Sequence, residues 1–264
     1  MTKTTNKLSV AIITYNEIDY IKKCIAAVSF ADEIVVVDSY SEDGTYEFLQ
    51  SHPQVRVLQH SFENFTLQKS FALEQVQYNW VLFIDADEIV TADLRDEITK
   101  ILTKPTDKVA YWFYRQFMFQ QQELRYSGWQ TDKNFRLFKK SNVKFLDSKI
   151  VHETLEVDGD VGILKNKLTH YCYKNFEDYK SKMIRYGKLK AVQAFYTEKK
   201  FSYIFMVLKP GWKFFNHYFL RLGFLDGKKG FTISYLNALG VYARYKELKS
   251  LEKKNKLAHY LVMP

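Results

Sequence analysis

Four short apolar runs alternate with segments of helical periodicity over residues 8–84, and this alternation constrains the fold more than any other feature of the sequence. Each run is short enough to be a strand that is buried on both faces. Strands that alternate with helices predict a mostly parallel sheet with right-handed crossovers and helices on both faces. We expect strands at residues 8–14, 33–38, 55–58 and 80–84, with helices at 17–29, 45–51 and 66–77.

Polar or acidic residues follow three of these four strands, at positions 14–17, 38–39 and 85–88. Ligands of such sheets bind outside the carboxyl ends of the strands. Residues two apart in an extended chain point the same way, so Asp85 and Asp87 face one side and repel each other unless a cation or a proton lies between them. Mg²⁺ is often bound by one or two carboxylates together with substrate phosphates. The pattern predicts a metal–diphosphate site, with an acidic first helical turn as the structural alternative.

Glycine-rich phosphate-binding turns are absent from the sequence. A dinucleotide site needs Gly-x-Gly-x-x-Gly after the first strand, but the first glycine of this chain is Gly44. No Gly-x-x-x-x-Gly-Lys-Ser/Thr loop occurs either. Any bound phosphates must therefore be held by a metal and by side chains.

The pattern changes after a predicted helix at residues 94–102. Residues 109–119 are rich in aromatic side chains, which favour strands. Further short strands are expected at residues 134–139, 143–146 and 150–157. This half is expected to complete the sheet.

Charge is distributed unevenly along the chain. Residues 1–164 carry a net charge of −6, whereas residues 165–264 carry +15, which indicates an anionic partner for the second part. Residues 201–221 are strongly aromatic, but Lys209, Pro210 and Lys213 interrupt them. A spanning helix needs about 20 mostly apolar residues, so this segment is predicted to lie on an anionic membrane surface. A helix pair that packs on the catalytic domain, with solvated lysines, is the alternative.

The two cysteines, Cys24 and Cys172, form neither a disulfide framework nor a metal-ligand spacing, which suits a reducing cytoplasm. Residues 1–7 are polar and do not predict a signal peptide.

Three blocks of the sequence, residues 9–17, 34–45 and 83–88, resemble the family 2 inverting glycosyltransferases in order and spacing. Residues 134–138 and 151–153 are similar to the small bacterial members that add glucose to the heptose of a lipopolysaccharide inner core. The resemblance implies an α/β fold, with one Rossmann-like (GT-A type) domain on a mixed sheet, and the charge and spacing of residues 175–264 add a basic, aromatic, helical C-terminal extension. It also implies a UDP-sugar donor and a divalent metal, Mg²⁺ or Mn²⁺.

The resemblance assigns nucleotide-binding roles to residues at the first two strand ends. Thr14, Tyr15, Asn16 and Glu17 are expected to line the nucleotide pocket, and Asp38 is expected to contact the base or the ribose.

Five further residues receive roles around the diphosphate. Lys69 is expected near the nucleotide or diphosphate, and Asp85 and Asp87 match the Asp-x-Asp element, with Asp87 nearest the metal. His170 is a candidate third metal ligand, with a structural histidine as the alternative. Arg136 can clamp a diphosphate or an anionic acceptor by paired hydrogen bonds, or it is a surface charge.

The acceptor hydroxyl needs a general base, because its own pKa is far above neutrality. The resemblance favours Glu153, in the acceptor half of the chain. Asp132 is the second candidate and Glu88 the third.

The sequence as a whole predicts a catalytic domain at residues 1–174, with a nucleotide-sugar half (1–104) and an acceptor half (105–174), and a membrane-associating extension at residues 175–264. We expect transfer of a hexose, first of all glucose, from a UDP-sugar to a glycolipid such as a lipopolysaccharide inner-core heptose. The expected location is the inner face of the cytoplasmic membrane.

Three alternatives stay open at this point. The acceptor can be another surface polysaccharide or a lipid-linked sugar. A nucleotidyltransferase would carry a glycine-rich basic loop where this chain has residues 15–17. A non-enzymatic module for anionic lipid or nucleic acid would rely on residues 165–264, but no recognised nucleic-acid motif occurs there, so no nucleic-acid partner is expected.

Overall fold

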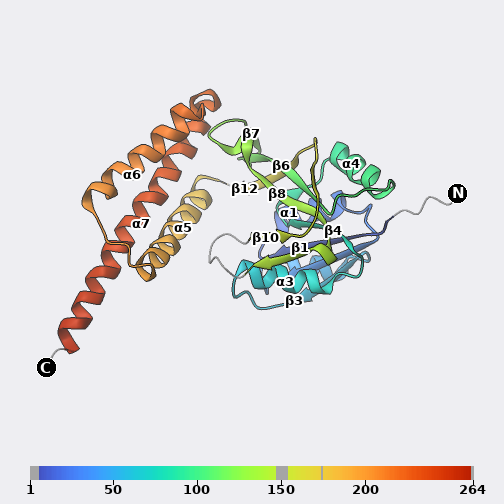
Figure 1. The fold of residues 1–264 in the computed structure, drawn as a ribbon, viewed down its shortest axis with the longest axis horizontal. Coiled ribbons are helices and arrows are strands. Elements are labelled where there is room, and N and C mark those ends of the chain that lie inside the picture. The colour runs from blue at the N-terminus through green and yellow to red at the C-terminus, as the bar shows by residue number, and fades with distance from the viewer. Residues whose placement is uncertain (1–5, 147–153, 174, 263–264) are drawn as a thin grey trace. The chain divides into compact units, whose positions relative to one another are not determined.

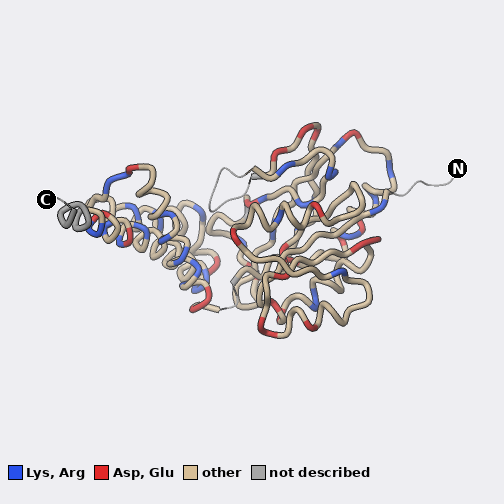
Figure 2. The backbone as a smooth tube through the Cα atoms, turned by 90° about the horizontal axis from the view of Figure 1, so that it is seen from below, with Lys and Arg blue, Asp and Glu red and all other residues tan. Residues whose placement is uncertain are grey.

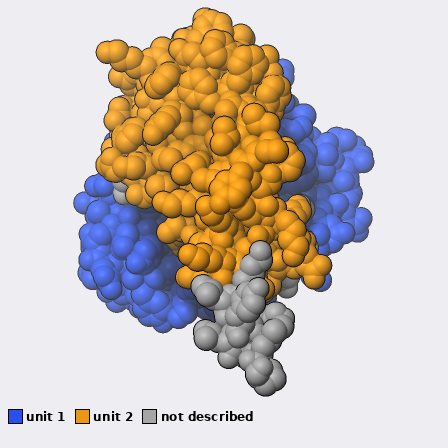
Figure 3. Space-filling model, turned by 90° about the vertical axis from the view of Figure 1, so that its left-hand side faces the viewer, with its two compact units in different colours: residues 1–116, 131–172 blue, residues 117–130, 173–264 orange. Residues whose placement is uncertain are grey.

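The computed structural model describes residues 6–146, 154–173 and 175–262. The chain folds into two compact units, which Figure 3 shows in different colours. Residues 1–116 and 131–172 make up the first unit, and residues 117–130 and 173–264 make up the second.

A mixed β-sheet forms the centre of the first unit (Figure 1), with strand order β3-β2-β1-β4-β8-β6-β12-β5. The first four strands are parallel, and β8 then pairs antiparallel with both β4 and β6. Its strands are β1 (Leu8–Thr14), β2 (Glu33–Asp38), β3 (Val55–Gln59), β4 (Trp80–Asp85), β5 (Glu88–Ile89), β6 (Ala110–Phe119), β8 (Lys133–Lys139), β11 (Val161–Ile163) and β12 (Leu168–Tyr173). The strands β9 (Val143–Leu146) and β10 (Thr154–Val157) pair with each other in a separate two-stranded sheet, so this part of the second half does not extend the main sheet as expected.

Alternate side chains of the central strands enter cores on opposite faces of the sheet, as the two-residue period of a strand requires. Val10 and Ile12 pack with α1 (Ile18–Ala27), α2 (Thr45–Ser51) and α4 (Ala92–Leu102). On the other face, Ala11 and Ile13 pack with α3 (Phe65–Gln75). Because β1 is buried along its whole length, its sequence is continuously apolar rather than alternating.

The parallel register brings the polar strand ends to one edge of the sheet. Thr14 of β1 lies opposite Asp38 of β2, and Ile13 lies opposite Asp85 of β4. The expected convergence of residues 14–17, Asp38 and Asp85 is therefore present in the structure.

The second unit is built on three helices, α5 (Phe176–Tyr196), α6 (Tyr203–Phe215) and α7 (Gly227–Val262). It also holds β7 (Gln122–Leu124), the π-helical turn η3 (Asn216–Leu220) and the 3-10 turn η4 (Gly223–Asp226). The 3-10 turns η1 (Trp129–Thr131) and η2 (Lys140–Asn142) lie elsewhere in the described residues. Within the described ranges, no helix is long and apolar enough to cross a membrane.

Asp226 explains why residues 117–130 belong with the helices. Its carboxylate accepts hydrogen bonds from the backbone N–H of Arg125 (3.1 Å) and of Tyr126 (2.9 Å). Ser127 N–H also donates to the Arg221 carbonyl at 2.9 Å. These bonds join the β6–β7 hairpin to the η3–η4 region across about a hundred residues of sequence.

Most predicted elements lie within a few residues of the expected positions. The strands at 33–38 and 143–146 and the helix at 45–51 have the expected bounds. Helix α4 begins at Ala92, before the expected residue 94, because the Thr91 side chain caps it by accepting from Leu94 N–H at 3.3 Å. Pro210 lies inside α6 and does not end it.

Candidate active site

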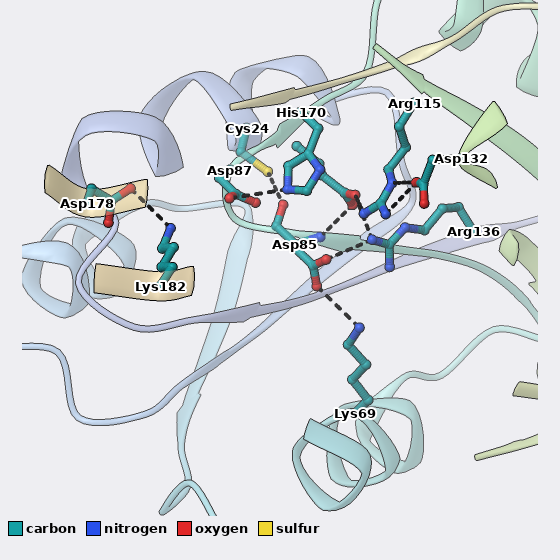
Figure 4. A network of polar contacts seen from close by, with 11 residues as sticks. Cys24, Lys69, Asp85, Asp87, Arg115, Asp132, Arg136, His170, Asp178 and Lys182 are labelled. Carbon is teal, nitrogen blue, oxygen red and sulfur yellow. Dashed lines mark hydrogen bonds and ion pairs between the residues drawn. The ribbon is translucent and has the colours of Figure 1, made fainter. Parts of the chain in front are cut away.

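Asp85 lies at the carboxyl end of β4 and faces two cations (Figure 4). Its Oδ2 atom is 2.7 Å from Arg136 Nη2, and its Oδ1 atom is 3.5 Å from Lys69 Nζ. Burial alone would raise the pKa of Asp85, but the charges of Arg136, Lys69 and His170 outweigh it and hold that pKa well below its usual range. Asp85 is therefore a carboxylate whose charge is balanced by protein cations.

Glu88 is completely buried and contacts the same Arg136 nitrogen as Asp85 does. Its Oε1 atom is 2.6 Å from Arg136 Nη2 and 3.4 Å from Arg115 Nη1, and its Oε2 atom accepts from Asp85 N–H at 3.0 Å. Burial disfavours the charge on Arg136, but Asp85 and Glu88 raise its pKa above the ordinary value. Glu88 thus holds two arginines in place, and its burial argues against the role of general base.

Asp132 joins this network through Arg115. Its Oδ2 atom accepts from Arg115 Nε at 2.6 Å and lies 2.5 Å from Arg115 Nη2. A third of the Asp132 side chain is exposed, in contrast to Glu88. Asp132 is thus an oriented and accessible carboxylate, which is what a general base requires.

Asp87 and His170 form a separate pair. The Asp87 Oδ2 atom is 3.4 Å from His170 Nε2. Strand β12 pairs antiparallel with β5 and places His170 opposite Glu88, while Tyr171 N–H donates to the Asp87 carbonyl at 2.9 Å. In Figure 4, Asp87 points toward His170 and Asp85 points toward Lys69 and Arg136.

The donor atoms of this pair fit a divalent cation. One carboxylate oxygen and one imidazole nitrogen lie side by side, and both residues keep some exposure, at 17% and 11% of their side chains. Such a pair suits a cation that completes its coordination shell with phosphate oxygens and water. No cluster of three or more acidic, histidine or cysteine residues suited to a metal occurs among the described residues. Asp87 and His170 are therefore the better candidate ligands, and Asp85 is occupied by cations.

The turn after β1 is fixed to the turn after β2. Asn16 adopts a left-handed backbone conformation (φ 54°), and its N–H donates to Ser41 Oγ at 2.8 Å. Its side-chain Oδ1 atom accepts from Glu42 N–H at 2.8 Å. Ser41 in turn donates to Asp38 from its hydroxyl (2.5 Å) and from its N–H (3.0 Å). Asp38 is fully buried, so its carboxylate holds this double turn together.

The other residues expected at the nucleotide differ in exposure. Tyr15 is 57% exposed, which leaves its ring free to stack on a base. Thr14 is buried, and its Oγ1 atom has no hydrogen-bond partner among the described residues. Glu17 N–H donates to Thr45 Oγ1 at 3.0 Å, so the segment Asp43–Thr45 supports the pocket as well as starting α2.

The structure thus brings most of the predicted site residues together, and Glu153 lies outside the described residues. Arg115 and Ser41 were not predicted. A signal for Arg115 was available, because it is the one charged residue in the aromatic run 109–119, and a charge on a largely buried strand needs a partner. Ser41 gave no signal, since a serine in a polar turn is ordinary.

Residues 9–155 match the protein family described as Glycosyl transferase family 2. The chain belongs to this family. Among curated relatives of this glycosyltransferase, the lipopolysaccharide core biosynthesis glycosyltransferase LpsC of Rhizobium meliloti is 28% identical over 250 residues, which covers 90% of this chain and 93% of the relative. The uncharacterized glycosyltransferase RC0292 of Rickettsia conorii is 29% identical and covers 96% and 94%, respectively.

A solved structure shares the fold of this glycosyltransferase. The mannosyltransferase PcManGT from Pyrobaculum calidifontis, in complex with GDP-Man and Mn²⁺, aligns with a TM-score of 0.52 and 14% identity over 92% of this chain and 87% of that chain. The α/β, GT-A type fold expected from the sequence is confirmed, together with the identity of the protein as a glycosyltransferase.

Proposed function

We propose that this family 2 glycosyltransferase transfers a hexose, with glucose as the first donor to test, from a UDP-sugar to a hydroxyl of a glycolipid such as the heptose of a lipopolysaccharide inner core. The observation that carries the proposal is the convergence, at the carboxyl ends of β1, β2 and β4, of the double turn at Asn16 and the two acids Asp85 and Asp87. The relative named for lipopolysaccharide core biosynthesis, similar over nearly its whole length, supports this class of acceptor.

The donor is proposed to occupy the edge of the sheet that Tyr15 and the double turn border. The exposed ring of Tyr15 would stack on the base, and Thr14 Oγ1 is a buried polar atom that a ligand could satisfy. Glu17 would complete the pocket, while Asp38 acts by holding the turn that bears Asn16.

Asp87 and His170 would hold a divalent cation, Mg²⁺ or Mn²⁺, beside the diphosphate. When bound, such an ion stabilises the negative charge that develops on the departing UDP. Lys69 and Arg136 lie on the other side of Asp85 and add fixed positive charge next to the same position. Asp85 keeps these two cations oriented.

A single in-line displacement inverts the anomeric carbon, so the base must lie opposite the leaving group. We propose Asp132 or Glu153 for this role. Asp132 has the support of geometry, because Arg115 fixes one of its oxygens and the side chain stays accessible. The base accepts the proton of the acceptor hydroxyl as the new glycosidic bond forms.

The division of labour in the chain is also a proposal. Residues 1–174 would carry catalysis, and residues 175–264 would associate with the anionic inner face of the cytoplasmic membrane, where a lipid-linked acceptor is found. The net charge of +15 over residues 165–264 supports this location.

A donor panel tests the proposal. UDP-sugars are incubated with Mn²⁺ and a glycolipid acceptor, UDP release is followed, and the mass of the acceptor product is measured. UDP-glucose together with Mn²⁺ is expected to raise the melting temperature more than either alone. Asp87→Asn is expected to abolish transfer and this joint stabilisation, whereas the exposed control Asp107→Asn leaves both unchanged. If no nucleotide sugar stabilises the protein in the presence of metal, the proposal fails.

A further inference from the structure

Helix α6 and the turn η3 carry a line of exposed apolar side chains, which we call the exposed stripe. Its members follow one another at intervals of four, four, three and four residues, so they share one side of the helix. They are Ile204 (67% exposed), Leu208 (61%), Trp212 (58%), Phe215 (42%) and Phe219 (47%). Not one residue of α6 is buried.

Other side chains of α6 and η3 pack against α7. The Phe214 ring lies 5.5 Å from the Phe231 ring of α7, and the Tyr218 ring lies 5.8 Å from it. His217, between them in sequence, is buried. Because these ring contacts already hold α6 and η3 against α7, the exposed stripe is not required to fold the unit. Large apolar patches left on a surface mark sites of interaction with a membrane or another protein.

The charge around the exposed stripe has one sign. No acidic residue occurs between Glu198 and Asp226, whereas Lys209, Lys213 and Arg221 lie within this segment. Figure 2 shows basic residues spread along the helices of this unit. Burial lowers the pKa of Lys213, and the nearby charges of Arg221 and Lys190 lower it further.

We infer that the exposed stripe is a docking surface for an anionic lipid bilayer, with the stripe inserted at the boundary of headgroups and acyl chains and Lys209 and Arg221 beside the lipid phosphates. Aromatic and aliphatic side chains on one face with basic residues around them are the pattern of helices that lie in this boundary. A second copy of the chain is a poorer occupant, since pairing two such surfaces would bring like charges together. The inference rests on the proposed membrane location and adds the residues that make the contact.

Flotation of the full-length protein with vesicles tests the inference. Binding is expected to vesicles of phosphatidylethanolamine and phosphatidylglycerol, and to be weak with phosphatidylcholine alone. Leu208→Ser with Trp212→Ser is expected to lower the partition coefficient at least about tenfold, because each lost apolar group removes inserted surface. Ile163→Ser is the matched control, since Ile163 is 53% exposed on β11 of the other unit and is expected to leave binding unchanged.

Two further measurements make the outcome decisive. Lys209→Glu is expected to weaken binding to the anionic vesicles only. The melting-temperature shift caused by a UDP-sugar with Mn²⁺ is expected to be the same in all these variants, so a failure of catalysis and a failure of docking are read separately. Unchanged flotation of the Leu208→Ser/Trp212→Ser protein would overturn the inference. Light scattering that shows a dimer turned into a monomer by these changes, with vesicle binding retained, would instead assign the surface to self-association.

Discussion

Replacing Arg136 by methionine is expected to destabilise the catalytic unit strongly, because this one side chain balances the fully buried Glu88 and the partly buried Asp85. Arg136 is only 6% exposed, and its Nη2 atom lies 2.7 Å from Asp85 and 2.6 Å from the fully buried Glu88. Without it, Glu88 keeps Arg115 at 3.4 Å as its cationic partner among the described residues, and Asp85 keeps Lys69 at 3.5 Å. Methionine preserves much of the apolar stem, so the change isolates the charge.

The magnitude follows from the burial of the pair. Removing one partner of a buried ion pair costs about 3–5 kcal/mol, because the remaining charge is left uncompensated. For a chain of this size, that loss lowers the melting temperature by about 2–4 °C per kcal/mol. Urea unfolding and a thermal scan of the two purified proteins measure both quantities.

Two comparisons identify the cause of the loss. Arg95→Met removes an exposed arginine that pairs with Asp96, and it is expected to cost less than about 1 kcal/mol. Adding Glu88→Gln to Arg136→Met is expected to cost less than the sum of the single changes, since one unbalanced charge disappears. A loss below about 1 kcal/mol for Arg136→Met would refute the view that Glu88 and Asp85 require this arginine.

Three further outcomes are expected. Burial and nearby cations hold the pKa of His217 at about 4, below its ordinary 6.5, so the folded state binds fewer protons than the unfolded state. The free energy of unfolding is therefore highest, as far as His217 decides it, above about pH 6.5, and it decreases as the pH falls toward 4. In urea unfolding, His217→Gln should reduce this decrease. Gly187→Ala should destabilise by about 1–3 kcal/mol, because an added methyl overlaps the backbone of α7, whereas Gly211→Ala, with open space around it, should stabilise by up to about 1 kcal/mol in the same assay. His170→Gln should weaken Mn²⁺-dependent binding of the donor, without the loss of stability expected for Arg136→Met. Calorimetric titration measures the affinity for the donor. If this affinity is unchanged, His170 is not a ligand of the proposed metal.

Local periodicity was sufficient to predict the parallel half of the sheet and its helices. The strands β1 to β4 are short apolar runs because helices cover both faces of the sheet, and such runs can be recognised in the sequence. Since parallel strands end at a common edge, the order of the polar residues after β1, β2 and β4 also predicted the location of the site. The resemblance to family 2 glycosyltransferases added the roles that we propose for the residues of that site.

The partners of the charged groups could not be predicted, because they come from distant parts of the chain. Arg136 contacts Asp85 and Glu88 from 51 and 48 residues away, and no local periodicity of the sequence predicts contacts over such separations. The sequence therefore grouped Asp85 with Asp87 as neighbours of one metal, whereas the structure turns one acid toward Arg136 and the other toward His170.

The two sides of α6 show the same division between sequence and structure. The sequence determined that residues 201–221 are aromatic, basic and free of acids, which is a property of composition. Because apolar residues occur all around this helix, no period could tell which of them pack. Only the tertiary structure decided that Phe214 and Tyr218 contact α7 and that Leu208 and Trp212 stay exposed, since burial depends on the position of a second helix that local sequence does not encode.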